Sequence, residues 1–140
     1  MMEAAVKSSL KDASKIAFWD DDGRIYYSNF QTNAEELRGL ARVLGDRESA
    51  IKQGMVAGGV RYEVHRHHPP AVYGRTMDGA PESSEGAAVY KVEPGLCGRP
   101  CYGFISYKMP NLSARMVPML QTFCHKHLVG ENSVPVVPAA

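Results

Sequence analysis

The chain has 140 residues, which is enough for one domain around a single modest core. Its 16 basic and 15 acidic residues give a formal net charge of +1. This excludes binding to nucleic acid or to an anionic membrane through overall charge, but it is compatible with a local basic patch. Apolar residues make up 44% and charged residues 22%, so we expect a folded globular protein. No apolar run approaches the roughly 18 residues needed for a membrane span, and the N-terminus lacks a signal-peptide pattern. The three cysteines favour reduced thiols in a cytoplasmic protein over a disulfide framework.

The first half of the chain predicts a helix, a hairpin and two further helical segments. Asp22 and Gly23 end a polar turn between two apolar runs, and this pair favours a hairpin because glycine accepts positive φ. Thr32 and Glu35 have the spacing of a capping box, so we expect a helix that begins at Thr32 and ends at Gly45. The expected elements are a helix over residues 1–12, strands over 16–19 and 24–28, a helix between 32 and 45, and a helical turn over 46–53.

The second half predicts a run of strands and a closing helix. Val60, Tyr62 and Val64 alternate with polar residues, which is typical of a strand with one buried face. Pro118 lies inside the pattern of the last helix, where we expect it to kink the helix or to delay its start, because proline removes a backbone donor. The further expected elements are strands over 71–77, 86–92 and 101–107, a polar turn over 78–85, a loop over 93–100 and a helix over 111–128.

The order of these elements predicts an α+β fold with a central antiparallel sheet. The N- and C-terminal helices are expected on one face of the sheet and the short helices on the other. The apolar stripe that packs the last helix is expected to consist of Leu112, Met116, Leu120, Phe123 and His127. We expect one domain over residues 1–130 and a flexible tail over residues 131–140.

Histidine and cysteine residues cluster in the sequence without the spacing of a metal site. Zinc sites usually combine two closely spaced pairs of ligands, and the three residues between Cys97 and Cys101 are at the edge of the usual spacing. We therefore expect no metal and no cofactor, and a disulfide between these two cysteines stays an alternative for an oxidising compartment. The acidic turn at 20–22 lacks the spaced ligands of a calcium loop. The sequence has no nucleotide-binding or hydrolase motif, so we expect no enzymatic activity.

The most specific feature is the segment 54–66, which reads Gly-Met-Val-Ala-Gly-Gly-Val-Arg-Tyr-Glu-Val-His-Arg. It resembles the profilin segment Gly-hydrophobic-x-hydrophobic-Gly-Gly-x-Lys/Arg-Tyr-x-Val-x-Arg. Residues 34–37 are similar to that family's Pro-Glu-Glu-hydrophobic helix start, and residues 22–28 are similar to its Asp-Gly hairpin. The resemblance covers about residues 2–130. It implies a protein that binds monomeric actin with one face, binds proline-rich peptides with another, and responds to phosphoinositides.

The resemblance also implies which residues would contact actin. Arginine suits this role, because its planar guanidinium can hold the carboxylates of an acidic partner. The alternative is that these side chains are only the solvated faces of strands. Met77 stands where the family has a further basic residue, and the last helix keeps one basic match. The implied actin-binding residues are Lys52, Arg61, Val64, Arg66, Arg75 and Arg115.

The site for proline-rich peptides is expected to be degraded. Such a site needs an aromatic trough for a polyproline II helix, and the N-terminal helix here has no aromatic residue. The surface could still bind something apolar. The positions that face the peptide by resemblance are Met2, Ala5, Tyr26, Phe123 and Cys124.

These observations predict a non-enzymatic, profilin-like protein of the cytoplasm and cytoskeleton that binds actin monomers and modulates their assembly. The alternative is a profilin-like structural or adaptor subunit of a larger cytoskeletal assembly, for instance a ciliary or axonemal one, without actin binding. Small α/β folds of the longin or roadblock type are an alternative for the fold, although they lack the Gly-Gly-x-Arg-Tyr segment.

Overall fold

The computed structural model describes residues 2–77 and 83–129, with the side chain of Cys97 left out. Part of the expected turn at 78–85, the expected tail at 131–140 and the alternative Cys97–Cys101 pairing therefore lie outside the described residues. The helices are α1 (Met2–Ser9), α2 (Ala34–Arg42), α3 (Arg47–Gln53) and α4 (Ser113–His127), with a short 3-10 turn, η2, at Leu96–Gly98.

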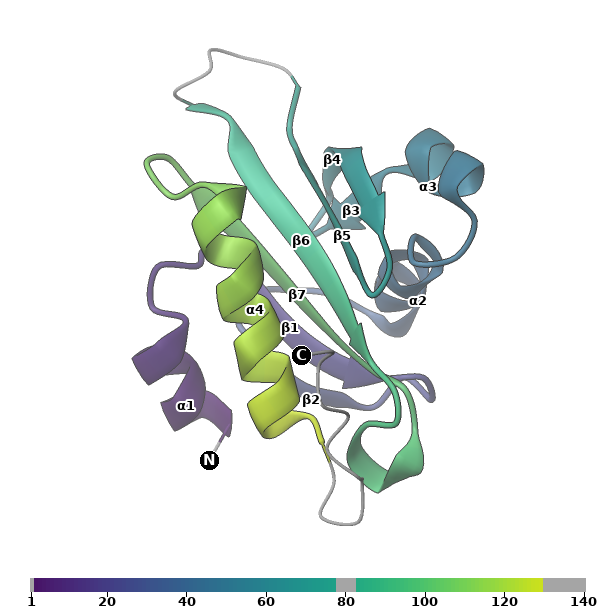
Figure 1. Cartoon of the computed structure of the whole chain (residues 1–140), viewed down its shortest axis with the longest axis vertical. Helices are drawn as coiled ribbons and strands as arrows, with labels where there is room; N and C mark the ends of the chain where they lie inside the picture. Colours follow the sequence, from purple (N-terminus) through teal and green to yellow (C-terminus); the bar gives the residue numbers. More distant parts are fainter. Residues whose placement is uncertain (1, 78–82, 130–140) are drawn as a thin grey trace.

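Seven antiparallel strands form one curved sheet in the order β2-β1-β7-β6-β5-β4-β3 (Figure 1). The strands are β1 (Ile16–Asp20), β2 (Ile25–Ser28), β3 (Met55–Ala57), β4 (Val60–His68), β5 (Ala71–Arg75), β6 (Glu85–Val92) and β7 (Cys101–Lys108). The longest run of pairing joins β6 to β7, through registers such as Val89↔Phe104. Strand β4 pairs with β5 through registers such as Glu63↔Arg75. The sheet therefore brings the N-terminal hairpin beside the last strand, as Figure 1 shows.

Two apolar cores lie on opposite faces of this sheet. One core joins α1 and α4 to the sheet, and its largest side chains include Phe18, Tyr107 and Phe123. The other core packs α2 and α3 against the opposite face around Tyr62 and Phe104. Burial of apolar surface on both faces, at roughly 25 cal/mol per Å², is the main force that holds the layers together. The α+β fold, with terminal helices on one face and short helices on the other, is confirmed.

The start of α2 differs from the predicted capping box by one residue. The N-cap is Asn33, whose side chain accepts a hydrogen bond of 2.9 Å from the Glu36 backbone N–H. Thr32 instead donates its hydroxyl to the Glu36 carboxylate at 2.7 Å. Asparagine has the higher N-cap preference, so it displaces threonine from the cap position.

The last helix also departs from its prediction in two places. It runs unbroken through Pro118, so the expected delay of its start is wrong. Leu112 lies before the first turn and is 51% exposed, which removes it from the apolar stripe, while Met116, Leu120 and Phe123 are buried as expected. A proline is tolerated here because packing of the stripe against the sheet outweighs one missing backbone hydrogen bond. Among the described residues, no helix combines the length and apolar character that crossing a membrane requires.

Candidate functional site

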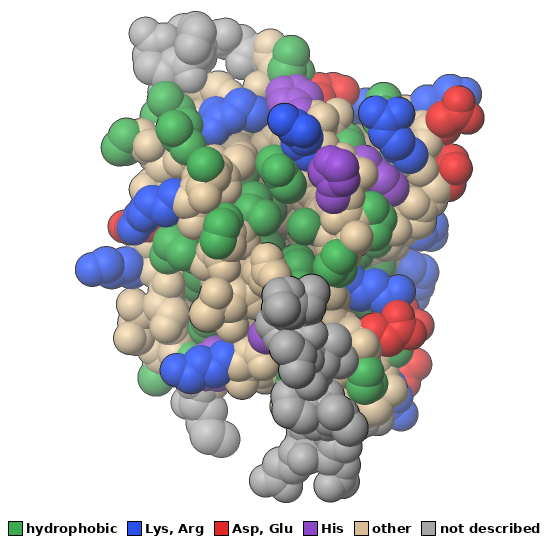
Figure 2. Space-filling model, in the orientation of Figure 1, with side chains coloured by type: hydrophobic (Ala, Val, Ile, Leu, Met, Phe, Trp, Pro, Cys, Tyr) green, Lys and Arg blue, Asp and Glu red, His purple; other side chains and the backbone are tan. Residues whose placement is uncertain are grey.

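The first candidate surface lies on the outer sides of β4 and β5, beside α4. Residues paired across neighbouring strands project to the same side of a sheet, and Glu63 pairs with Arg75 while Arg66 pairs with Tyr73. Tyr73 packs at the rim of the core under α4, which fixes the side on which this set lies. We call the side chains of Arg61, Glu63, Arg66, Tyr73 and Arg75 the β4–β5 face. In Figure 2, basic and histidine side chains gather over this region, towards the upper right of the view.

A β-bulge places Arg66 on the β4–β5 face. Simple alternation would put Arg66 on the same side as Tyr62 and Val64, which point into the opposite core. The register shifts between Val64 and Arg66, so one extra residue, His65, is inserted at that point. After the bulge it is His67 that turns inward, where its Nε2 lies 2.9 Å from the Val43 carbonyl oxygen.

The basic side chains of this face differ in how firmly they are held. The Arg61 guanidinium makes an ion pair with Glu63 at 3.0 Å and donates to the Lys52 carbonyl oxygen at 3.0 Å. Arg75 donates to the Ser84 hydroxyl at 3.0 Å. Arg66 is exposed and makes no hydrogen bond or ion pair within the described part of the chain. Arg66 is therefore the cation of this face that can approach an acidic partner with the least rearrangement.

Two of the residues that the resemblance assigned to actin lie elsewhere. Val64 is only 9% exposed and belongs to the core under α2 and α3, because it shares the inward side of β4 with Tyr62. Arg115 makes an ion pair of 2.7 Å with Asp12, on the side of α4 that faces the α1–β1 connection. Neither side chain contributes an exposed contact to the β4–β5 face. Lys52 lies on α3 next to Arg61, through the carbonyl contact described above.

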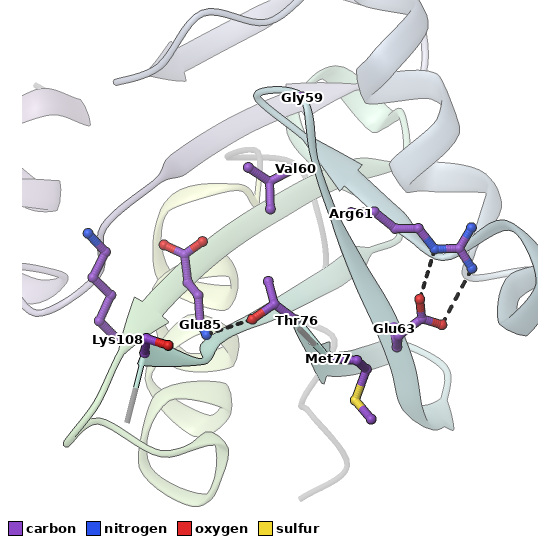
Figure 3. Close-up of a pocket in the computed structure, with 9 residues that line it drawn as sticks. Gly59, Val60, Arg61, Glu63, Thr76, Met77, Glu85 and Lys108 are labelled. Carbon is purple, nitrogen blue, oxygen red and sulfur yellow. Dashed lines mark hydrogen bonds and ion pairs between the residues drawn. The ribbon is translucent and has the colours of Figure 1, made fainter. Parts of the chain in front are cut away.

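An open cleft of about 840 Å³ adjoins this face where β5 ends (Figure 3). Its lining includes Val60, Arg61, Glu63, Met77, Glu85 and Lys108. The mixture of acidic and basic side chains gives the cleft no dominant charge. Figure 3 shows Glu85 pointing towards the middle of the cleft and Met77 at its edge.

A buried polar network supports the cleft from below. Tyr62 donates to the Glu85 carboxylate at 2.5 Å and receives a hydrogen bond of 2.8 Å from the Lys15 ammonium group. Burial and the bond to Glu85 raise the pKa of Tyr62 far above its usual value, so its hydroxyl stays protonated. The Lys15 charge is 3.7 Å from Glu85. The network is satisfied within itself, which favours a structural role.

The second candidate surface is a groove of about 300 Å³ between α1 and α4. We call it the α1–α4 groove. Its lining consists of Ser9, Pro118, Met119, Thr122, Phe123, Lys126 and His127. Phe123 forms its floor, packed 4.4 Å from the His127 ring and stacked on Phe18 at 4.8 Å, as measured between ring centroids. Burial, and to a lesser extent Lys126, lower the pKa of His127, so its imidazole is neutral at pH 7.

The five residues assigned to a proline peptide do not form an aromatic trough. Phe123 and Cys124 are buried, and burial raises the pKa of the Cys124 thiol, which keeps it protonated and unreactive. The Tyr26 hydroxyl donates to the Asp20 carboxylate at 2.9 Å. Met2 and Ala5 are half-buried at the edge of the core. Sequence reasoning missed the exposed stripe of Pro118, Thr122 and Lys126, which the spacing of four residues on a helix could have indicated.

Within residues 2–77 and 83–129, no group of three or more histidine, cysteine or acidic side chains is arranged to hold a metal ion. The histidines of β4 are instead divided by the bulge. His65 lies 3.3 Å from the Met77 sulfur on the outside, and His67 contacts the α2 end on the inside.

Comparison with known proteins identifies the class of fold. No protein-family model and no curated protein sequence matches the chain. Among solved structures it is similar to Schizosaccharomyces pombe profilin, with 17% identity and a TM-score of 0.70 over 90% of this chain and 95% of that one. It is also similar to Acanthamoeba castellanii profilin II, at 15% identity and a TM-score of 0.65 over 85% and 87% of the two chains. The corresponding values for Acanthamoeba castellanii profilin IB are 13%, 0.65, 84% and 86%. The chain therefore has a divergent profilin-like fold.

Proposed function

We propose that this protein binds monomeric actin through the β4–β5 face and thereby modulates actin assembly. The observation that carries the proposal is the outward position of Arg66, which the β-bulge brings beside Tyr73 and Arg75. An exposed arginine next to an aromatic ring is the kind of contact that contributes most to protein interfaces. The profilin-like fold supports a non-enzymatic, cytoskeletal role in the cytoplasm and suggests actin as the partner.

The charge distribution is suited to an acidic partner. Arg61, Arg66 and Arg75 outnumber Glu63, so the β4–β5 face is basic although the whole chain has a net charge of only +1. Charge complementarity of this kind raises the association rate and fixes the orientation of the partner. Binding should therefore weaken as the salt concentration rises. The same basic character is what a response to phosphoinositides would use.

A titration of purified protein with monomeric actin tests the proposal. The Arg66→Glu variant should bind actin at least about tenfold more weakly than the wild type, because reversing a central charge replaces attraction by repulsion. The Arg38→Glu variant is the matched control, since Arg38 is an exposed arginine on α2, on the other side of the sheet. A folded wild type that fails to bind actin at concentrations on the order of tens of micromolar would refute the proposal.

A second candidate is a fixed subunit of a larger cytoskeletal assembly, without actin binding. It is favoured by the exposed apolar side chains of Met109 and Leu112, at 43% and 51% exposure, between β7 and α4. Apolar contacts survive high salt, whereas the charged contacts of the β4–β5 face do not. A stable partner that co-purifies with the protein at high salt would therefore support this candidate. Binding of proline-rich peptides has the least support, because the α1–α4 groove lacks an exposed aromatic trough.

A further inference from the structure

We propose that Met77 is a site of reversible oxidation, at which a peroxide converts the thioether to a sulfoxide that His65 then holds by a hydrogen bond. Met77 follows β5 and lies at the edge of the open cleft (Figure 3). This chemistry needs no partner protein, so it is independent of the proposed actin binding.

Met77 is the most accessible methionine among the described residues. Its exposed fraction is 66%, compared with 43% for Met109. A soluble oxidant must reach the sulfur atom, so oxidation slows as the side chain becomes buried. The other described methionines are half-buried or fully buried, and they are Met2, Met55, Met116 and Met119.

The cysteine side chains that the structure describes do not compete with Met77 for an oxidant. Cys101 and Cys124 are both fully buried. Burial also raises the pKa of the Cys124 thiol, which keeps it protonated, whereas the thiolate is the form that reacts with peroxide. Among the described side chains, the sulfur most open to an oxidant is therefore that of Met77.

The fold holds the Met77 sulfur next to a hydrogen-bond donor. His65 is the extra residue of the β-bulge in β4, and its Nε2 lies 3.3 Å from the Met77 sulfur. A thioether sulfur has no hydrogen to donate, so the Nε2 atom carries the hydrogen and donates it. This bond uses one of the two lone pairs of the sulfur and leaves the second available to an oxidant.

The oxidation step is the transfer of one oxygen atom. The available lone pair of the sulfur attacks one oxygen of hydrogen peroxide, so a sulfur–oxygen bond forms while the oxygen–oxygen bond breaks. The transferred oxygen loses its proton to the departing hydroxide, which leaves as water. The sulfur gives up two electrons, and the peroxide is reduced by them. Methionine sulfoxide reductases reverse the change with electrons from a thiol and release the oxygen as water.

The sulfoxide oxygen makes a stronger contact with His65 than the thioether does. Sulfur in a thioether is only a weak acceptor, whereas the sulfoxide is polar and carries a partial negative charge on its oxygen. Rotation about the exposed side-chain bonds brings this oxygen to the Nε2–H of His65, which already lies beside the sulfur. Oxidation would therefore tie the end of β5 to the bulge of β4. Because Arg66 follows His65, the new polar group would lie at the border of the β4–β5 face.

Limited oxidation of the full chain with hydrogen peroxide tests the site. Trypsin cleaves after lysine and arginine, so it separates residues 76–91, whose one methionine is Met77, from residues 109–115, whose one methionine is Met109. Mass spectrometry of the two peptides over time gives both rates from one sample. We expect Met77 to gain an oxygen atom at least about threefold faster than Met109, and the buried Met55 to stay unmodified. Methionine sulfoxide reductases with a thiol should then remove the oxygen from Met77.

Nuclear magnetic resonance tests the role of His65. In the oxidised wild type the Nε2 resonance of His65 should shift, because the acceptor of its hydrogen bond has changed from sulfur to oxygen. The ring resonances of His68, which is exposed on the same strand, should stay unchanged. The Met77→Leu variant is the matched control, because peroxide should leave the ring resonances of its His65 unchanged.

Three results would overturn the proposal. Oxidation of Met109 or Met55 as fast as Met77 would show that exposure does not select Met77. A sulfoxide at Met77 that leaves the His65 ring resonances unchanged would show that His65 does not hold it. A sulfoxide that the reductases leave intact would contradict the reversibility.

Discussion

The β4–β5 face and the α1–α4 groove lie on either side of the same helix, α4, yet they differ in how accessible their charged and aromatic side chains are to a partner. On the β4–β5 face, Arg66 is exposed, and Tyr73 and Arg75 beside it are half-buried, so part of each side chain stays available to a partner. In the groove, Phe123 stacks on Phe18 and is nearly inaccessible. Alternate residues of a strand lie on opposite faces, so a strand can keep some side chains outside the core, whereas a helix that packs through a broad stripe uses its aromatic residues in the core.

The largest expected effect comes from breaking the strand pair that carries the β4–β5 face. A Cβ atom added at Gly74 would lie 1.6 Å from the Glu63 carbonyl oxygen, which is a backbone atom and cannot move away. We expect Gly74→Ala to lower the free energy of unfolding by about 3 kcal/mol or more, measured by urea denaturation.

Gly39→Ala is the matched control for that experiment. Gly39 lies in α2, and the nearest atom to an added Cβ is a flexible Gln53 side-chain nitrogen at 3.6 Å. Because alanine is the better helix former, this variant should be as stable as the wild type or more stable by about 0.5–1 kcal/mol. Equal stability of the two alanine variants would contradict the close strand approach at the bulge.

A smaller effect concerns Tyr26, which the resemblance assigned to a peptide ligand. Burial alone would raise the pKa of Asp20, but hydrogen bonds from Tyr26 and from the backbone N–H groups of Arg24 and Asp22 outweigh it, so the pKa is lowered. A lowered pKa in the folded state means that these bonds stabilise the protein above the unfolded pKa of about 3.9 and are lost as the pH falls below it.

Tyr26→Phe should therefore cost about 1.5 kcal/mol at pH 7 and progressively less as the pH approaches 2.5. Denaturation curves at several pH values measure this. Tyr27→Phe is the control, because the Tyr27 hydroxyl has no hydrogen bond among the described residues. If Tyr26→Phe lowers the free energy of unfolding equally at pH 7 and at about pH 2.5, the Tyr26 hydroxyl does not act through the Asp20 carboxylate.

The smallest effect is expected from Arg115→Ala. Arg115 and Asp12 form an exposed ion pair, at 53% and 35% side-chain exposure, so its loss should change the stability by less than about 1 kcal/mol. Because Arg115 faces the α1–β1 connection, its loss should change the actin affinity by less than about twofold. A tenfold loss of actin affinity would show that the actin contact reaches Arg115 and is not confined to the β4–β5 face.

Much of the fold could be predicted from the sequence because its signals are local. The alternation of Val60, Tyr62 and Val64 predicts the strand that contains these residues. The Asp-Gly pair at 22–23 likewise predicts the turn in which it lies. The α2 cap was predicted one residue early, because Thr32 and Asn33 are both capping residues and the capping-box spacing drew attention to Thr32, although asparagine has the higher N-cap preference.

The candidate surfaces were harder to predict, because they depend on contacts between distant parts of the chain. The bulge at His65 reverses the side on which Arg66 lies, and this shift exists only in the register between β4 and β5. Arg115 and Asp12 are 103 residues apart, so no local pattern could have indicated their ion pair. A family resemblance assigns roles to positions in the sequence. The bulge and the ion pair determine in which direction the side chains at those positions point.

Isotope-labelled protein titrated with unlabelled monomeric actin compares the two surfaces in one experiment. The amide resonances of Arg66, Tyr73 and Arg75 should shift or broaden as actin is added, while those of Ser9, Met119 and Thr122 should stay unchanged until the whole complex broadens. This result would place actin on the β4–β5 face. Changes confined to the α1–α4 groove, or no change on either surface, would contradict that assignment.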